Sequence, residues 1–332
     1  MFTALGDGAR TREGVAELLE CDRRAAGILL AALEDMGLVT RDGDRYALTA
    51  DTRRQLADPE GPEYVGGGLP FWLENLRAWT ELPRVVRTGE PVRTEARERT
   101  RDEMDRYMAA MGSGPPERTQ RVVAACLARL PDARTMLDLG GGPGHVARAF
   151  SKAGLAATLF DKREVVGFVT DAYRLADTGI ATVAGDFQHD PLPGPFDIVL
   201  ASNITHIYPP EANRALLQKI AGSVRPGGVV AVADFVRGRS PRAARFALVM
   251  LLRTEGGNTY TEAEYGRWLS DAGFHSMVVE DVDVDRQIIT AVRSEESSDG
   301  VLTPYSLLLT PYSSLLTYLT AASVRQTPGQ RS

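Results

Sequence analysis

Short apolar runs alternate with longer amphipathic stretches along the rear part of the chain. The first four runs are five or six residues long, which is typical of strands buried on both faces and too short for buried helices. They are Thr135–Leu139, Leu155–Phe160, Ile180–Ala184 and Phe196–Ala201. Because strands and helices alternate, the pattern predicts an α/β fold with a doubly wound parallel sheet.

Further elements extend this region to about residue 292. Apolar spacing and flanking turns predict a fifth strand within Arg225–Val236, followed by a closing antiparallel hairpin. The remaining expected elements are helices over 210–220, 244–252 and 262–271, and hairpin strands over 276–283 and 287–292.

The first strand ends in a glycine-rich turn, Gly140–Gly144, with a helix expected directly behind it. Glycine lets the backbone adopt a positive φ and approach a ligand closely, and the helix N-terminus leaves N–H groups aimed at the same place. Gly140 and Gly142 are therefore candidate ligand-binding positions. A single glycine-rich turn is weak evidence, so the residues at the ends of the other strands have to support it.

Polar and aromatic side chains come directly after the next three strands. Asp161 comes about 20 residues after the turn, where an acid can bind the two hydroxyls of a ribose. Asp186 and Phe187 follow the third strand and offer a carboxylate and an aromatic face for an adenine, and the fourth strand runs into Ser202 and His206. The carboxyl ends of parallel strands meet at one edge of the sheet, so the sequence predicts a nucleoside-binding crevice there.

The glycine spacing argues against a dinucleotide. A dinucleotide site carries Gly-x-Gly-x-x-Gly, whose last glycine packs the helix closely against the strand. In this chain the position of that last glycine is His145.

The front of the chain has a different pattern. Two short amphipathic helices within 11–36 precede a hairpin over 38–49, which together predict a winged helix. Such a module either binds DNA, for which Arg23 and Arg24 would open the recognition helix, or serves as a dimerisation platform. The formal net charge of −6 gives no basic footprint for nucleic acid, so we favour dimerisation.

A helical connector links the two regions. We expect one helix from Pro70 to about residue 87, a second over 95–111 and a third over 116–129. The second carries Met104, Tyr107, Met108 and Met111 at helical spacing, a stripe more typical of packing than of a substrate wall. The expected division is a winged-helix domain over 1–90, the connector over 91–130, a ligand-binding domain over 131–293 and a poorly ordered tail over 294–332.

Composition narrows the class of protein. The chain has 332 residues, 43% hydrophobic and 25% charged, as expected for a two-domain globular protein. Its two cysteines, Cys21 and Cys126, lie in separate predicted helices, and we expect both to be small core residues rather than a disulfide or a zinc site. There is no apolar run of roughly 20 residues and no pattern of a secretory leader, so we expect a cytoplasmic protein.

From about Leu5 to Val292 the chain resembles the class I S-adenosylmethionine (SAM)-dependent O-methyltransferases of plant phenolic, hydroxyindole and bacterial antibiotic biosynthesis. The resemblance rests on the winged-helix front and on a set of short motifs. These are Trp79 with Arg87–Pro91, Asp138–Gly142, Gly185–Phe187, Asp197–His206, Pro226–Gly228, Gly256–Gly257 and Ala272–Phe274. It implies a Rossmann-like sheet, SAM as cofactor, a small-molecule acceptor and a homodimer formed through the N-terminal domain.

The resemblance also implies roles for individual residues. Gly140 and Gly142 would line the SAM loop, Asp161 would bind the ribose, and Asp186 and Phe187 would hold the adenine. Ser202 occupies a position near the cofactor where plant members carry a lysine.

His206 falls on the catalytic base of the family. Of the four histidines, it alone lies just beyond the carboxyl end of a central strand, and an imidazole near neutral pKa suits removal of a hydroxyl proton. Asp234 falls where the family carries an acid beside that histidine. The family's second acid would fall on Thr259 and is therefore absent; Glu255 is close in sequence but does not match.

We expect Trp72, Tyr107, Met111, Met250 and the partner subunit to form the acceptor pocket, and we expect no metal. Two alternatives stay open. The methyl group could go to carbon or nitrogen instead of oxygen, or the chain could be a winged-helix transcriptional regulator whose rear domain senses a nucleoside.

Overall fold

The computed structural model describes residues 1–59, 61, 63–92 and 99–295. Residues 1–294 form one compact unit. The tail expected over 294–332 lies outside the described residues except for its first two, so its disorder stays a prediction, as do the expected domain boundaries. In the described part of the chain, no helix is long and apolar enough to cross a membrane.

The front of the chain forms a three-stranded antiparallel sheet, ordered β1-β3-β2, with short helices. Its elements are α1 (Phe2–Gly6), β1 (Arg10–Thr11), α2 (Arg12–Leu18), α3 (Arg23–Asp35), β2 (Val39–Asp42), β3 (Arg45–Leu48) and α4 (Ala50–Leu56). The side chains of Thr11 and Asp22 cap α2 and α3 by accepting the N–H groups of Gly14 and Ala25. The two expected helices and the hairpin are present, in the expected order.

The prediction that Cys21 is a core residue within a helix is wrong. Cys21 is exposed and lies in the turn between α2 and α3, because α2 ends at Leu18 and the Asp22 cap starts α3. Cys126 is fully buried, and burial raises the pKa of its thiol to about 12.

The connector departs from expectation at two points. Instead of one helix from Pro70, α5 (Leu69–Ala78) and α6 (Leu82–Thr88) flank a 3₁₀ turn over Trp79–Glu81. Pro83 explains the break, because it lacks the N–H that would bond to the carbonyl of residue 79. α7 (Arg101–Gly112) begins later than expected, at a capping box formed by Thr100 and Glu103. The expected start at 95–98 lies outside the described residues. α8 spans Pro116–Arg129, as expected.

The rear region is a seven-stranded sheet ordered β11-β12-β8-β7-β4-β5-β6. The strands are β4 (Thr135–Leu139), β5 (Ala156–Asp161), β6 (Ala181–Ala184), β7 (Phe196–Ser202), β8 (Val224–Asp234), β11 (Phe274–Asp281) and β12 (Gln287–Arg293). Strands β4 to β8 are parallel, and β12 pairs antiparallel with both β8 and β11. The strand order reverses between β4 and β7, the point at which doubly wound sheets bind ligands. The expected α/β doubly wound fold is confirmed.

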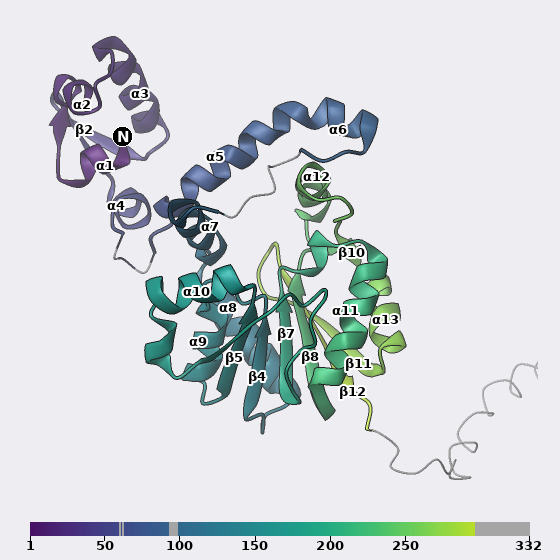
Figure 1. Cartoon of the computed structure of the whole chain (residues 1–332). Helices are drawn as coiled ribbons and strands as arrows, with labels where there is room; N and C mark the ends of the chain where they lie inside the picture. Colours follow the sequence, from purple (N-terminus) through teal and green to yellow (C-terminus); the bar gives the residue numbers. More distant parts are fainter. Residues whose placement is uncertain (60, 62, 93–98, 296–332) are drawn as a thin grey trace, which may run out of the picture. The chain divides into compact units, whose positions relative to one another are not determined.

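Helices cover both faces of this sheet (Figure 1). α8 packs on one face together with α9 (His145–Lys152) and α10 (Arg163–Ala172), and α11 (Pro210–Ser223) and α13 (Glu262–Asp271) pack on the other. α12 (Ala243–Arg253) lies beyond the carboxyl ends of the strands, and 3₁₀ turns span Leu175–Thr178 and, as η4, Thr205–Ile207. A further two-stranded parallel pair joins β9 (Val236–Arg237) to β10 (Tyr260–Thr261).

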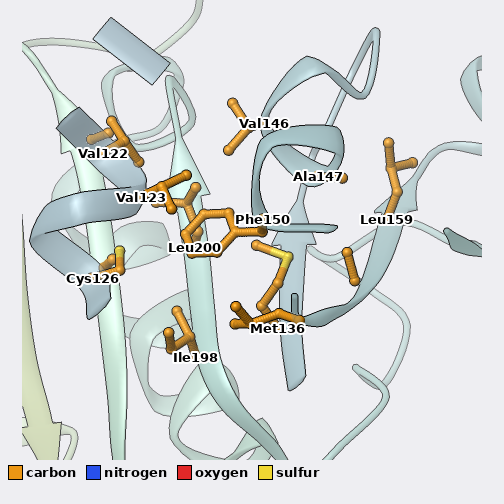
Figure 2. Packing of buried hydrophobic residues seen from close by; sticks show 14 of the residues in the cluster. Val122, Val123, Cys126, Met136, Val146, Ala147, Phe150, Leu159, Ile198 and Leu200 are labelled. Atoms are coloured by element: carbon orange, nitrogen blue, oxygen red, sulfur yellow. The ribbon is translucent and has the colours of Figure 1, made fainter. Parts of the chain in front are cut away.

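Alternation along the strands builds two hydrophobic cores. On β7, Ile198 and Leu200 join the core formed with α8 and α9, whereas Val199 and Ala201 join the core formed with α11 and α13. Figure 2 shows part of the first core, with Phe150 of α9 close to Leu200 of β7 and Val123 of α8. Because both faces of the sheet are covered, the strands consist largely of continuous apolar residues, and the candidate polar site residues lie at the strand ends.

Candidate active site

The glycine turn after β4 presents bare backbone. Gly140 and Gly142 adopt φ values of +66° and +49°, and Gly144, at +75°, directly precedes α9. A Cβ atom at Gly140 would lie 2.8 Å from Cδ1 of Ile204, whereas one at Gly142 would meet nothing within 4 Å. Gly140 is therefore required by packing and conformation, and Gly142 leaves an open surface that a ligand can approach.

Asp161 lies against this turn. Its Oδ2 accepts the N–H of Gly142 at 2.8 Å and its Oδ1 accepts the N–H of Lys162 at 2.7 Å. Burial raises the pKa of Asp161, and these two N–H donors oppose the increase. A carboxylate has about four acceptor positions, so capacity is left for the hydroxyls of a ribose.

Phe187 approaches the same turn from the end of β6. Its ring is buried, lies 3.6 Å from the position of a Cβ on Gly140, and packs edge-to-face with Tyr208 at 5.8 Å. The carboxylate of Asp186 caps the following turn by accepting the N–H of Gln188. An open glycine backbone, a carboxylate and an aromatic ring thus meet at one edge of the sheet, and these groups fit the nucleoside part of SAM.

His206 and Asp234 come from neighbouring central strands. His206 lies on η4, just after β7, and Asp234 is the last residue of β8. Nδ1 of His206 is 2.7 Å from Oδ1 of Asp234, and both side chains are buried. Oδ2 of Asp234 accepts the hydroxyl of Thr205 at 2.7 Å, and Oδ1 accepts the N–H of Phe235 at 2.8 Å.

These contacts determine the charge and the tautomer of the pair. Burial by itself would raise the pKa of Asp234, but the charge and hydrogen bond of His206, the charge of Arg286 and the Thr205 hydroxyl together lower it. The ionised carboxylate only accepts hydrogen bonds, so Nδ1 of His206 carries the proton that it shares with Asp234. In the neutral imidazole, Nε2 is then the nitrogen with a free lone pair, which can act as a base.

A further hydrogen bond, which the sequence did not indicate, holds Thr205 in place and through it Asp234. The hydroxyl of Tyr265, on α13, is 2.6 Å from Oγ1 of Thr205. Thr205 uses its own proton on Asp234, so Tyr265 donates to Thr205, and burial keeps the phenol protonated by raising its pKa well above 10. Because Tyr265 is 60 residues from Thr205 in the chain, no local pattern could have linked the two.

The loop before β10 supports the histidine from the other side. Asn258 donates its N–H to the carbonyl of His206 at 2.9 Å. A Cβ atom at Gly257 would lie 2.5 Å from that carbonyl oxygen, so the loop can approach only as glycine. At the position of the family's second acid, Thr259 is buried and donates to the carbonyl of Ala243, and Glu255 is exposed.

A cavity of about 850 Å³ opens in front of His206. Ser202 and the four expected acceptor-wall residues all line it, namely Trp72, Tyr107, Met111 and Met250. Phe246 also lines it and packs edge-to-face on the His206 ring at 4.8 Å. The helical stripe on α7 is divided: Met104 and Met108 belong to the core, whereas Tyr107 and Met111 face the cavity.

His145 also lines this cavity, so position at a strand end does not by itself single out His206. Burial and the charge of Arg118 lower the pKa of His145 and keep it neutral. Within the described ranges no side chain orients its ring by a hydrogen bond, whereas Asp234 orients His206. The same ranges contain no group of three or more potential metal ligands arranged around a common point.

Comparisons with known families, sequences and structures all match methyltransferases. Residues 85–275 match the family model described as the O-methyltransferase domain. The chain is 32% identical over 293 residues to 3-hydroxy-5-methyl-1-naphthoate 3-O-methyltransferase of Streptomyces sahachiroi, covering 82% of each chain. It is 33% identical over 287 residues to the tetracenomycin polyketide synthesis 8-O-methyl transferase TcmO of Streptomyces glaucescens, covering 82% of this chain and 84% of the relative.

Among solved structures, human N-acetylserotonin methyltransferase in complex with SAM superposes with a TM-score of 0.79 at 25% identity, covering 88% of this chain and 90% of the human one. These matches show that the chain belongs to the O-methyltransferase family and is a SAM-dependent methyltransferase.

Proposed function

We propose that this chain methylates a hydroxyl group of an aromatic small molecule, with His206 as the general base. The observation that carries the proposal is the buried pair in which Asp234 holds the Nδ1 proton of His206, a residue that lines the cavity, and leaves Nε2 without a proton. SAM supplies, when bound, an electrophilic methyl group on a sulfonium. The chain then has to hold the acceptor hydroxyl and remove its proton, which Nε2 accepts.

The cofactor would be held at the glycine edge of the sheet. Gly140 and Gly142 would leave room for it, Asp161 would bind the ribose hydroxyls, and Asp186 and Phe187 would hold the adenine. Ser202 lies in the cavity on the side of His206 and would contact the cofactor near its reactive end. Positioning of the two reactants supplies roughly 7–11 kcal/mol of such a barrier, and a base adds about 10²–10⁴-fold in rate.

Two observations support an aromatic acceptor. The cavity lining includes several rings and thioethers, with Phe246 in contact with His206 and with Trp72, Tyr107 and Met250 among the others, which suits a flat apolar molecule. The two Streptomyces relatives act, by their names, on a naphthoate and on a tetracenomycin polyketide. We therefore propose a hydroxylated, polyketide-type aromatic acceptor.

We further propose that the chain works as a homodimer through its first 90 residues. On α5, Leu69, Trp72, Leu73 and Leu76 recur at helical spacing and are between 43% and 65% exposed. Such an apolar stripe on a single chain is typical of an association surface. Trp72 also lines the cavity, so the partner subunit would contribute to closing it.

Methyl transfer from labelled SAM to a panel of hydroxynaphthoates and hydroxyanthraquinones tests the proposal, with NMR of the product to locate the methyl group on oxygen, nitrogen or carbon. His206→Ala is expected to lower kcat by about 10²–10⁴-fold while S-adenosylhomocysteine still binds. His145→Ala is the matched control and is expected to retain most of the activity. Asp161→Ala is expected to weaken S-adenosylhomocysteine binding. Full turnover in the His206 variant would remove the base assignment.

A further inference from the structure

Arg286 is a cation in the cavity whose charge helps to keep Asp234 ionised but whose hydrogen-bond donors the methyl-transfer chemistry described above does not use. It lies in the turn between β11 and β12 and lines the cavity with His206. Its guanidinium lies over the ring of Phe235, with Cζ 3.6 Å from the ring centroid, and its Nη1 donates to Oδ1 of Asn203. Stacking and one hydrogen bond thus hold the group in a defined place at the tip of β7.

The acids around Arg286 are already engaged. Asp283 pairs with Arg118, Asp285 pairs with Arg242, and Asp234 is held by His206 and Thr205. Within the described part of the chain, no carboxylate lies within 4.0 Å of the Arg286 guanidinium, and its Nε and Nη2 donors have no protein acceptor. Burial lowers the pKa of Arg286 to about 10, against the opposing charges of Asp234 and Asp283.

Arg286 is half-buried, and a cation in a cavity without an ion-pair partner has donors left for a ligand, as is typical of binding sites. The charge of the surrounding cavity has the same sign. Five arginines, among them Arg106 and Arg118, and two glutamates are included in its described lining, although the whole chain carries a net charge of −6. The cavity therefore attracts anions in a protein that otherwise repels them.

We propose that Arg286 binds a carboxylate of a ligand in the cavity that it lines together with His206. The Nε and Nη2 edge offers two parallel donors, the geometry that suits a bidentate carboxylate. Phe235, on which Arg286 stacks, has its ring centroid 6.5 Å from that of His206, so Arg286 and His206 lie close to each other. The proposal rests on the proposed function, and two sources have the required chemistry: the methionine carboxylate of SAM and an acid group on the acceptor.

Calorimetry with two matched ligand pairs separates these sources. The first pair is S-adenosylhomocysteine and its decarboxylated analogue. The second is 3-hydroxy-1-naphthoate and 2-naphthol, titrated into protein saturated with S-adenosylhomocysteine. Wild-type protein is expected to prefer the carboxylate member of one pair by about tenfold or more, and Arg286→Met is expected to abolish that preference. If Arg286→Met loses the preference in the first pair, Arg286 binds the methionine carboxylate of SAM. If it loses the preference in the second pair, Arg286 binds an acid group of the acceptor.

Arg242→Met removes a paired arginine close to Arg286 and is expected to change neither preference. Arg286→Lys keeps the charge but lacks the two parallel donors, so it is expected to retain only part of the preference. This variant replaces Arg286→Met in the test if the methionine variant does not fold. Preferences unchanged by both Arg286 substitutions, or absent from the wild type, overturn the proposal. Failure of the proposed function is a separate result, because it appears as no S-adenosylhomocysteine binding or no methyl transfer in the wild type.

Discussion

Asp234 decides which nitrogen of His206 carries the proton. A histidine with no partner exchanges its proton between the two ring nitrogens, whereas here the carboxylate holds it on Nδ1 at 2.7 Å. Thr205 and the Phe235 N–H satisfy the remaining acceptor positions of the acid and keep it from rotating. The acid therefore acts on the base by orientation as well as by charge.

Asp234→Asn tests this dependence. The amide group can donate to Nδ1, which would move the imidazole proton to Nε2 and remove the free lone pair from the cavity. We expect kcat to fall by about 10²–10⁴-fold with S-adenosylhomocysteine affinity unchanged. Steady-state kinetics and calorimetry measure the two quantities, and Asp132→Asn, at an exposed position, serves as control. An unchanged kcat would show that the tautomer does not matter.

Asp138, the fourth of the five residues of β4, predicts a pH effect on stability. Burial raises its pKa to about 7, although the N–H of Ala147 opposes the increase. Between about pH 4 and 7 the unfolded chain has released this proton and the folded chain still holds it, so the wild type loses stability as pH rises. Above pH 7 the loss reaches on the order of 4 kcal/mol.

Asp138→Asn removes this titration. The stability of the variant relative to the wild type is expected to increase from about pH 4 to 7 and then level off. Urea unfolding across this range measures the difference, and Asp132→Asn is expected to give a flat line. A flat line for Asp138→Asn as well would mean that the folded chain keeps the carboxylate ionised at every pH tested.

At the scale of elements, sequence patterns predicted most bounds because each element carries its own start or stop signal. Strand β4 and helices α8 and α13 match in full, and the front helices begin at the expected caps. The pattern failed where one residue outweighed the periodicity, as at Pro83. It could not find the two-residue strands β1, β9 and β10, because pairings that short depend on distant partners.

The same limit applies to the site. Residues at strand ends, such as Asp161 and His206, could be found because parallel strands bring their ends together. The contacts of Tyr265 with Thr205 and of Arg286 with Asn203 link segments 60 or more residues apart. They depend on how α13 and the final hairpin dock on the sheet, which no local pattern encodes.

The loop at Gly257 packs closely against the backbone of η4, which carries His206. In Gly257→Ala the new Cβ would lie 2.5 Å from the His206 carbonyl and 2.8 Å from that of Ile207, so the loop or η4 must shift. We expect kcat to fall roughly 10–100-fold and the free energy of unfolding to fall by about 1–3 kcal/mol. Gly167→Ala is the control, because a Cβ there meets nothing within 4 Å. Wild-type kinetics in the Gly257 variant would show that η4 tolerates the shift.

At the scale of the whole molecule, the apolar stripe on α5 predicts the assembly. Leu76→Glu, combined with Leu73→Glu, would place two charges at positions 65% and 51% exposed in the single chain. We expect a homodimer for the wild type and a monomer for the double variant, by light scattering coupled to size exclusion. Activity is expected to fall as well, since Trp72 lies on the same helix. Val284→Glu, at a position 80% exposed, is the control.

The hydrogen-bond chain behind His206 has a consequence for each catalytic cycle. Tyr265 donates to Thr205, Thr205 donates to Asp234, and the described neighbours of Asp234 on that side are all donors. With His206 as the proposed base, a proton on Nε2 would therefore leave through the cavity rather than through this chain of donors. Loss of this proton and release of the methylated product would thus both take place through the cavity. A bulky product that dissociates slowly would then also delay the return of His206 to its neutral form.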